Sequence, residues 1–223
     1  MTEDEARAWL QRQFDVSRET WALLERYVAL LLDEGKNQNL IAESTRNDVW
    51  ARHVVDSAQL LLHAPPGQTG ALWVDLGSGA GLPGVIVAIL SGYDVLMIEM
   101  RRKRAEFLEA VVRGLALPNA RVFCGKAERA STAQHAAIIS ARAFAPIERL
   151  IPSALHLADF STIWLLPKGQ NHQNELAIVR RLWQCDASAE PSVTAADSAI
   201  VKLSHVRQQR RHGVRTGKAD GRA

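Results

Sequence analysis

Residues 73–84 read WVDLGSGAGLPG, and this stretch is the most informative one for the fold. It begins with a short apolar run that ends in an aspartate, and half of its last eight residues are glycine: Gly77, Gly79, Gly81 and Gly84. Because glycine has no Cβ atom, such a segment can turn tightly and let a ligand approach the main chain. Ligands of open α/β sheets bind beyond the carboxyl ends of the strands. The stretch therefore predicts a ligand-binding turn between a buried strand and the helix that follows it.

The sequence around this turn alternates between two hydrophobic patterns. Short apolar runs typical of buried strands lie at residues 71–76, 94–100, 120–125, 136–143, 161–169 and 199–208. Segments with helical spacing lie between them, at residues 84–92, 101–117, 146–158 and 173–184. Strands that alternate with helices favour an α/β fold, with a mostly parallel sheet and helices on both faces.

The first 64 residues have a different character and predict a helical extension. Thr2 and Glu5 match a capping box ahead of a first helix, and Gly35 can end a second helix that begins near Thr20. A third helix is expected at residues 48–63, before a break at PPGQTG. We therefore expect an N-terminal extension (1–64), a ligand-binding core (65–206) and a basic tail (207–223) within one domain.

The composition indicates a globular protein without a membrane span. Hydrophobic residues make up 47% of the chain and charged residues 23%, and the longest apolar runs are too short to cross a bilayer. The acidic N-terminus has no apolar signal core, so a cytoplasmic protein is expected. The two cysteines suggest neither a metal site nor a disulfide framework, and Cys124, which follows an apolar run, is expected in the core.

Two basic clusters are candidate contacts for nucleic acid. One is RRKR at residues 101–104, and the other is the tail at 207–223, which carries six Arg or Lys against one Asp. Arg207, Arg210 and Arg211 are the tail residues that we expect to meet RNA phosphates. The alternative is a solvated face and a disordered tail, as the polar, basic, glycine-containing composition also predicts.

Three details limit which class of ligand can bind at the glycine turn. Asp75 gives the pattern D-x-G-x-G-x-G, and a carboxylate there suits a cationic ligand better than a pyrophosphate. Glu99 ends the next strand, where a carboxylate can accept hydrogen bonds from both hydroxyls of a ribose. No G-K-[ST] phosphate-binding motif is present. S-adenosylmethionine, with a ribose, an ammonium and a sulfonium, fits all three; the alternative is a tight turn with an incidental glutamate.

From about residue 37 to residue 169, the chain resembles the RsmG (GidB) family of methyltransferases. The DLGSGAGLPG loop is the centre of the resemblance, and its GLPG ending is more specific than the general glycine pattern. Further segments match in order: NQNLIAES (37–44), RHVVDSAQLL (52–61), GKAERA (125–130), ISARAFAPIERL (139–150) and LLPKG (165–169).

The resemblance implies a class I, Rossmann-like methyltransferase with a seven-stranded sheet, a reversed last strand and an N-terminal helical extension. It implies S-adenosylmethionine as the donor and N7 of a guanine in 16S rRNA, within the 30S subunit or its precursor, as the acceptor. The expected donor site includes Asp75, Gly77, Gly79 and Gly81 of the glycine motif, with Gly77 a cofactor contact by resemblance, and Glu99 at the end of the next strand, which matches the ribose-binding position. By resemblance, this site also holds Leu82, Ala127, Glu128 and, close to the donor, Arg142.

Methylation of guanine N7 makes modest chemical demands on the protein. N7 carries an exposed lone pair and can attack the sulfonium methyl without losing a proton, so no general base and no metal are expected. Arg142, at a strand end, can position a phosphate or a guanine edge, or else form a structural ion pair. Lys168, on the same rim, is either a phosphate contact or a solvated lysine.

The third predicted helix carries Arg52, His53 and Asp56 on one turn. Arg52 and Asp56 can pair at i,i+4, and His53 can meet Asp56 at i,i+3. This group either contacts RNA, braces the extension against the donor site, or forms a local polar network. A monomer is expected. Two other functions stay open from the residues alone: an NAD-dependent oxidoreductase and a non-catalytic RNA-binding module.

Overall fold

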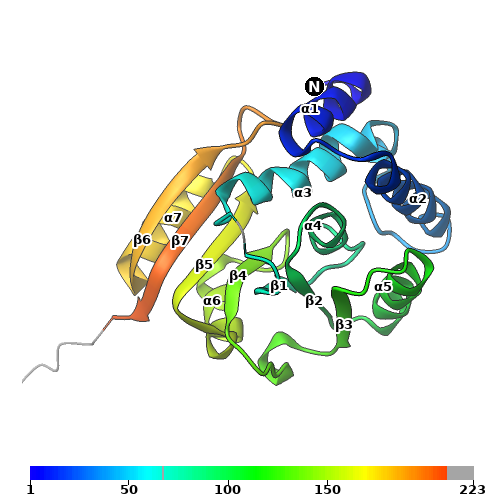
Figure 1. The fold of residues 1–223 in the computed structure, drawn as a ribbon. Coiled ribbons are helices and arrows are strands. Elements are labelled where there is room, and N and C mark those ends of the chain that lie inside the picture. The colour runs from blue at the N-terminus through cyan, green and yellow to red at the C-terminus, as the bar shows by residue number, and fades with distance from the viewer. Residues whose placement is uncertain (67, 210–223) are drawn as a thin grey trace, which may run out of the picture.

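The computed structural model describes residues 1–66 and 68–209, and seven of its strands form one sheet in the order β3-β2-β1-β4-β5-β7-β6 (Figure 1). All pairs from β3 to β5 are parallel, whereas β7 runs antiparallel to both β5 and β6. The α/β class and the reversed last strand are therefore confirmed. The strands are β1 (Leu72–Leu76), β2 (Asp94–Glu99), β3 (Ala120–Cys124), β4 (Ala136–Ala141), β5 (Ala158–Lys168), β6 (Trp183–Pro191) and β7 (Ala199–Gln208).

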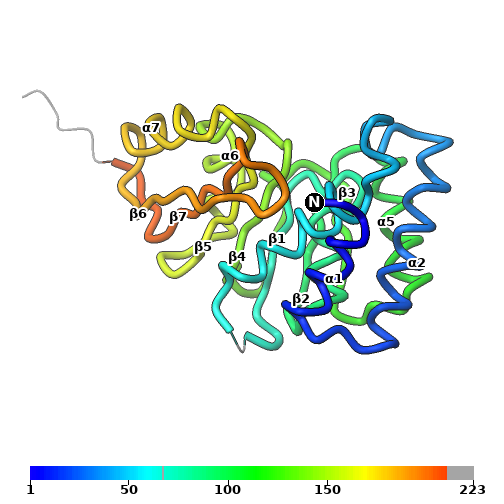
Figure 2. The backbone as a smooth tube through the Cα atoms, turned by 90° about the horizontal axis from the view of Figure 1, so that it is seen from above, coloured from blue at the N-terminus to red at the C-terminus, as the bar shows by residue number. Residues whose placement is uncertain are grey.

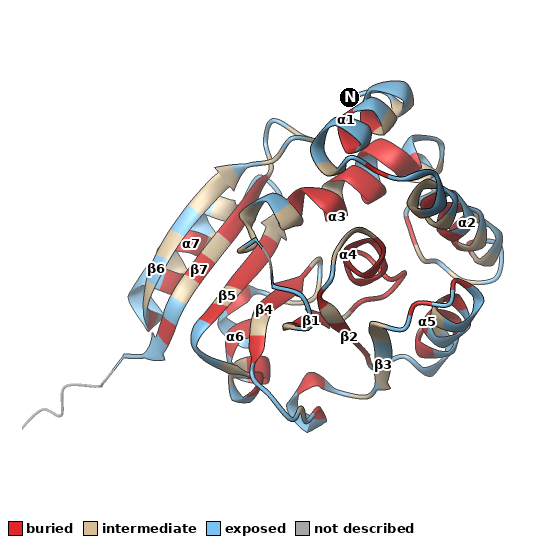
Figure 3. Ribbon diagram, viewed as in Figure 1, coloured by how far each residue is buried: buried red, intermediate tan, exposed pale blue. Residues whose placement is uncertain are grey.

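Helices cover both faces of the sheet (Figure 2). On one face lie α4 (Gly84–Leu90) and α5 (Arg102–Gly114), and on the other lie α6 (Ile147–Ala154) and α7 (His172–Leu182). Each face has its own hydrophobic core. Strand β1 supplies Trp73 to one core and Leu72 and Val74 to the other, and its five residues are buried (Figure 3). This double burial explains why β1 is apolar almost throughout.

The N-terminal extension packs on the α4 and α5 face. It begins with α1 (Glu3–Phe14) and α2 (Arg18–Glu34), and the predicted capping box of Thr2 and Glu5 is present. The hydroxyl of Tyr27, in α2, donates a hydrogen bond of 2.9 Å to the carbonyl of Ala80 in the glycine turn. The extension thus contacts the glycine turn directly.

The expected third helix at residues 48–63 is not one regular α-helix. It consists of four short segments: the 3₁₀ helix η1 (Glu43–Asp48), the π-helix η2 (Trp50–Val55), α3 (Asp56–Ala58) and the 3₁₀ helix η3 (Gln59–His63). The Glu3 carboxylate accepts hydrogen bonds from the Trp50 and Ala51 amides, which satisfies donors at the start of the π-helix. Hydrophobic spacing does not distinguish a π-helix from an α-helix over so few residues, so the sequence missed this change.

Two expectations at the C-terminal end need correction. The predicted helix at 173–184 ends at Leu182, and Trp183 begins the edge strand β6, whose polar sequence gave no strand signal. Strand β7 matches the predicted strand at 199–208, so the expected start of the tail at residue 207 is wrong, and Arg207 lies within the sheet. Short 3₁₀ segments, η4 (Ala127–Arg129) and η5 (Leu155–Leu157), complete the fold.

The Cys124 prediction was wrong, because this residue is exposed at the end of the edge strand β3. An edge strand is covered on fewer sides than a central one, so its apolar run does not guarantee burial. Among the described residues, no helix has the length and apolar character to cross a membrane.

Candidate functional site

The predicted site residues gather at the carboxyl edge of the sheet. Gly77 directly follows β1, Glu99 ends β2, Arg142 directly follows β4, and Lys168 ends β5. Strand β1 lies between β2 and β4, so the order of the strands reverses here. A crevice opens at such a reversal in α/β sheets, and it is where their ligands bind.

The glycine turn adopts a backbone that other residues rarely accept. Gly77, Gly79 and Gly81 all have positive φ angles, of 65°, 57° and 95°. A Cβ atom on Gly77 would overlap the Phe144 ring, and one on Gly81 would lie 2.6 Å from the Val85 side chain. The glycines therefore serve two needs, since Gly77 faces the crevice while Gly81 lets α4 and α5 pack close behind the turn.

Glu99 holds the turn against β2. Its carboxylate accepts hydrogen bonds from the Gly79 amide (2.9 Å) and from the Arg101 amide (2.7 Å). The residue is only 4% exposed. An ionised carboxylate has about four acceptor positions, so each oxygen keeps capacity for one more donor. A ribose, with two adjacent hydroxyls, matches that remaining capacity.

A cavity of about 460 Å³ opens beside the turn. We call it the donor cavity; it is lined by Gly77, Glu99, Ala127, Glu128, Ala143 and Phe144, together with the basic residues Arg101, Arg104 and Lys126. Its volume is typical of a small-molecule site. The structure therefore brings four of the predicted donor residues, from three separate strand ends, to one cavity.

Asp75 lies behind the turn and does not line the donor cavity. Its side chain is fully buried and accepts hydrogen bonds from the Gly84 amide (3.2 Å) and the Ser140 hydroxyl (2.8 Å). Burial raises the pKa of this carboxyl to about 6 from 3.8, against the opposing effect of these hydrogen bonds. The expectation that Asp75 contacts the donor is therefore corrected: it joins the turn, α4 and β4. Leu82, 4% exposed, likewise packs in the core.

A larger cavity, of about 740 Å³, adjoins the first. We call it the acceptor-side cavity; among the residues that line it are Arg52, His53, Asp56, Arg142, Lys168 and Glu175. Its walls come from the N-terminal extension, the ends of β4 and β5, α7 and the connection between β6 and β7. Arg52, His53, Arg142 and Lys168 thus share one cavity, whereas Arg101 and Arg104 of the RRKR cluster line the donor cavity.

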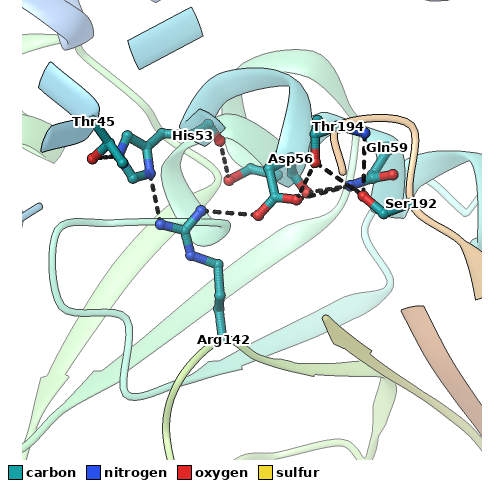
Figure 4. A network of polar contacts seen from close by, with 8 residues as sticks. Thr45, His53, Asp56, Gln59, Arg142, Ser192 and Thr194 are labelled. Carbon is teal, nitrogen blue, oxygen red and sulfur yellow. Dashed lines mark hydrogen bonds and ion pairs between the residues drawn. The ribbon is translucent and has the colours of Figure 1, made fainter. Parts of the chain in front are cut away.

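Arg142 is held by two residues of the extension (Figure 4). Its Nη1 donates to Asp56 Oδ2 at 3.1 Å, and its Nη2 donates to His53 Nδ1 at 2.7 Å. Asp56 Oδ1 in turn accepts hydrogen bonds from Gln59 (3.0 Å) and from Thr194 (2.9 Å). Asp56 therefore pairs with Arg142 and not with Arg52, contrary to the i,i+4 expectation.

His53 is neutral in this network. Burial, and then the charges of Arg142 and Arg52, lower its pKa to about 3. Because Nδ1 accepts from Arg142, the proton sits on Nε2 and is donated to the Thr45 hydroxyl at 2.8 Å. The Thr45 hydroxyl in turn donates a hydrogen bond to the Ala42 carbonyl. The hydrogen bonds from Arg142 to His53, from His53 to Thr45 and from Thr45 to Ala42, together with the Asp56 ion pair, fix the orientation of the Arg142 guanidinium.

Lys168 forms an ion pair in the wall of the acceptor-side cavity. Its Nζ lies 2.7 Å from Glu175 Oε2, and the two side chains are 12% and 18% exposed. The pair joins the end of β5 to α7, so Lys168 is not a solvated lysine, and its contact with a phosphate stays a prediction.

The basic residues of the tail do not join this site in the described part of the chain. Arg207 stacks on the Phe160 ring, with its guanidinium 4.0 Å from the ring centre. It lies eight residues beyond Ala199, the partner of Lys168 in the sheet, and so roughly 26 Å along β7 from the carboxyl edge. Arg210 and Arg211 lie outside the described residues.

Sequence reasoning missed several residues of the two cavities. Phe144 stands in a quoted segment, but nothing in its spacing marks it as a cavity residue. Gln59 and Thr194 donate hydrogen bonds to Asp56, and Gln59 also donates one to Ser192. The contacts of Thr194 and Ser192 each join positions more than 130 residues apart. No single-sequence signal reports such a contact, because it depends on how the β6–β7 connection folds back over the extension.

Comparison with known proteins agrees with this architecture. Among solved structures, a glycopeptide N-methyltransferase complexed with S-adenosyl-L-methionine superposes with a TM-score of 0.56 at 10% identity, over 68% of this chain and 93% of its own. An S-adenosylmethionine-dependent methyltransferase from Aquifex aeolicus gives the same TM-score, over 70% and 92% of the two chains at 10% identity. At such low identity these two show the fold alone.

Sequence relatives are much closer. The small-subunit rRNA methyltransferase G of Sphingopyxis alaskensis is 50% identical over 88% of this chain and 83% of its own length. The protein of the same name from Zymomonas mobilis is 43% identical over 98% and 99%. A family model described as GidB, rRNA small subunit methyltransferase G, matches residues 20–204. The chain therefore belongs to the GidB family of small-subunit rRNA methyltransferases.

Proposed function

We propose that this protein transfers a methyl group from S-adenosylmethionine to N7 of a guanine in small-subunit rRNA. One observation carries the proposal: in a member of the GidB family, a donor cavity built on the glycine turn and Glu99 adjoins an acceptor-side cavity that contains a fixed arginine. The substrate class, small-subunit rRNA, is inferred from the name of the relatives. Guanine N7 is supported as the acceptor atom because its methylation requires no general base.

The donor side of the proposal assigns roles to four residues. Gly77 lets the donor lie against the main chain, and Glu99 accepts hydrogen bonds from the ribose hydroxyls. Ala127 and Glu128, in η4 after β3, border the adenine end. When bound, S-adenosylmethionine supplies an electrophilic methyl group on a sulfonium. The protein's contribution is to hold the donor in one orientation and to limit the approach of water.

The acceptor side depends on Arg142. Its two contacts with Asp56 and His53 leave other N–H groups of the guanidinium available, since arginine has five donors in a fixed plane. We assign these donors to the guanine O6 edge or to an RNA phosphate, where they position N7 in line with the methyl group. The N7 lone pair forms the new C–N bond as the S–C bond breaks, so no residue has to remove a proton.

The test is methyl transfer from labelled S-adenosylmethionine to 30S particles and to free small-subunit rRNA, with the modified base identified after digestion. We expect label on guanine N7. Glu99→Gln should weaken donor binding about 10- to 100-fold, since it removes charge-assisted hydrogen bonds, whereas Glu106→Gln on the exposed face of α5 should not. Folded protein that binds the donor and leaves guanine N7 unlabelled would reject the proposal.

Family membership decides between the functions that the residues alone left open. An NAD-dependent oxidoreductase and a non-catalytic RNA-binding module both lose their support. A small-subunit rRNA acceptor makes the cytoplasm the expected place of action. The monomeric state is also part of the proposal, and sedimentation of the purified protein tests it.

A further inference from the structure

The donor cavity and the acceptor-side cavity have two lining residues in common, Ala143 and Phe144. Both belong to the segment between β4 and α6, directly after Arg142. Under the proposed function, the methyl group passes from one cavity to the other. The reacting atoms must therefore meet beside these two residues.

Phe144 is fixed against the glycine turn. Its ring packs so closely on Gly77 that a Cβ atom there would overlap it. The preceding residue, Ala143, has a φ of 52°, in the left-handed region that alanine rarely adopts. A backbone held in that region is strained, and such strain is retained where surrounding structure requires a particular side-chain position. The strained residue thus sets the place of the Phe144 ring.

Phe144 is also the single Phe, Tyr or Trp among the described residues that line either cavity. The one other aromatic ring there, that of His53, is only 6% exposed, and both of its nitrogens are hydrogen-bonded, to Arg142 and to Thr45. An unstacked RNA base loses its neighbours when it enters a protein site, and proteins commonly replace them with an aromatic side chain. The two cavities offer one surface for this purpose.

We propose that Phe144 is the stacking surface for the purine that accepts the methyl group. The ligand class is an unpaired or extruded purine nucleotide of RNA. One part of the ring rests on Gly77, so a base stacked on the part that faces the acceptor-side cavity lies next to the donor, while Arg142, two residues earlier, reaches its edge. This inference rests on the proposed function and adds to it the residue that holds the plane of the base.

The test compares three variants with the wild type in steady-state methylation of the rRNA acceptor. Phe144→Leu removes the aromatic face at similar volume, and Phe144→Tyr keeps it. Phe14→Leu makes the same exchange at a partly buried phenylalanine of α1, away from both cavities, and controls for general loss of packing. Calorimetry with S-adenosylhomocysteine measures the donor site separately.

We expect Phe144→Leu to lower kcat/KM for the rRNA about 10- to 100-fold, in line with the loss of one base–aromatic stack. Its affinity for S-adenosylhomocysteine should stay close to that of the wild type. Phe144→Tyr should recover most of the kcat/KM that Phe144→Leu loses, and Phe14→Leu should keep the wild-type value. Rescue by tyrosine separates stacking from a purely structural role.

Two results would overturn the inference while the proposed function stands. One is a Phe144→Leu protein with wild-type kcat/KM for an rRNA that the wild type methylates. The other is a loss that lies wholly in affinity for S-adenosylhomocysteine, which would make Phe144 a donor-site residue. A wild-type protein that binds the donor but does not methylate rRNA would overturn the proposed function itself, and this inference with it.

Discussion

Arg142 and Asp56 are 86 positions apart in the chain, yet their side chains form an ion pair with Nη1 and Oδ2 3.1 Å apart. Arg142 follows the central strand β4, whereas Asp56 belongs to the N-terminal extension. Both side chains are about one-fifth exposed, so the pair is well shielded from solvent. The extension is therefore part of the site, because it supplies the partners that orient the arginine.

The first prediction concerns this pair. Asp56→Asn replaces a carboxylate that accepts from Arg142, Gln59 and Thr194 with an amide that has one acceptor oxygen. We expect the free energy of unfolding to fall by about 1–3 kcal/mol, the usual cost of losing a hydrogen bond to a charged group. Activity should fall more than donor affinity. Denaturant unfolding and methylation assays measure the two effects.

Asp33→Asn is the matched control, because its ion pair with Lys36 is about three-quarters exposed on both sides. Exposed pairs contribute little to stability. If Asp56→Asn were no less stable and no less active than Asp33→Asn, the idea that Asp56 orients Arg142 would fail.

The second prediction is a pH dependence from His53. Its pKa is lowered to about 3 in the folded protein, against 6.5 when unperturbed. The unfolded chain therefore binds a proton below pH 6.5 that the folded protein does not, so the stability from neutral His53 is present above pH 6.5 and is lost as the pH falls. Between pH 7 and pH 5 this loss amounts to about 2 kcal/mol.

The variant His53→Asn isolates this effect, since asparagine keeps an acceptor for Arg142 and does not titrate. We expect the wild type to lose about 2 kcal/mol more than the variant between the two pH values, as measured by urea unfolding at each. Equal losses in the two proteins would show that His53 is not kept neutral by the fold.

The third prediction tests the glycine turn. Gly77→Ala places a Cβ atom against the Phe144 ring at a φ of 65°. The donor cavity should then be distorted, with S-adenosylhomocysteine binding weakened about tenfold or more, the equivalent of about 1.4 kcal/mol. Gly114→Ala is the control, because φ is not positive there and no atom lies within 4 Å of the added Cβ. Similar donor affinity in both variants would count against a donor that lies on Gly77.

The fourth prediction concerns residues 210–223, which carry five Arg or Lys against one Asp. Their removal, which leaves β7 complete, should weaken RNA binding and reduce its salt dependence, because fewer phosphates are neutralised. Donor affinity should not change. Filter binding over a salt series measures the RNA affinity and its dependence on salt concentration. If neither changes on truncation, residues 210–223 do not contribute to RNA binding.

Local spacing predicted the parts of the site that lie close together in sequence. The strand, glycine turn and helix around Gly77, and the carboxylate of Glu99 on the next strand, follow from hydrophobic pattern and distance along the chain. The resemblance added Ala127 and Glu128, which the structure brings to the same cavity. In contrast, the motif predicted that Asp75 contacts the ligand. In the structure Asp75 is buried behind the turn, where it accepts hydrogen bonds from Ser140 and from the first residue of α4.

Contacts between segments that are distant in the chain could not be predicted from the sequence. Helical spacing made Arg52 and His53 possible partners of Asp56, whereas its partner in the structure is Arg142, 86 positions away. Strand β6 has no apolar alternation, since it is an edge strand that forms because β7 offers it hydrogen bonds. Phe144 acquires its position from the strained backbone at Ala143, and the sequence around it carries no mark of that strain.

A crystal structure with S-adenosylhomocysteine would show whether the glycine turn and Glu99 form the donor site. We expect the nucleoside in the donor cavity, with both ribose hydroxyls within hydrogen-bonding distance of the Glu99 carboxylate and the adenine beside Ala127 and Glu128. A nucleoside bound elsewhere, or one in this cavity whose ribose does not contact Glu99, would rule out this donor site.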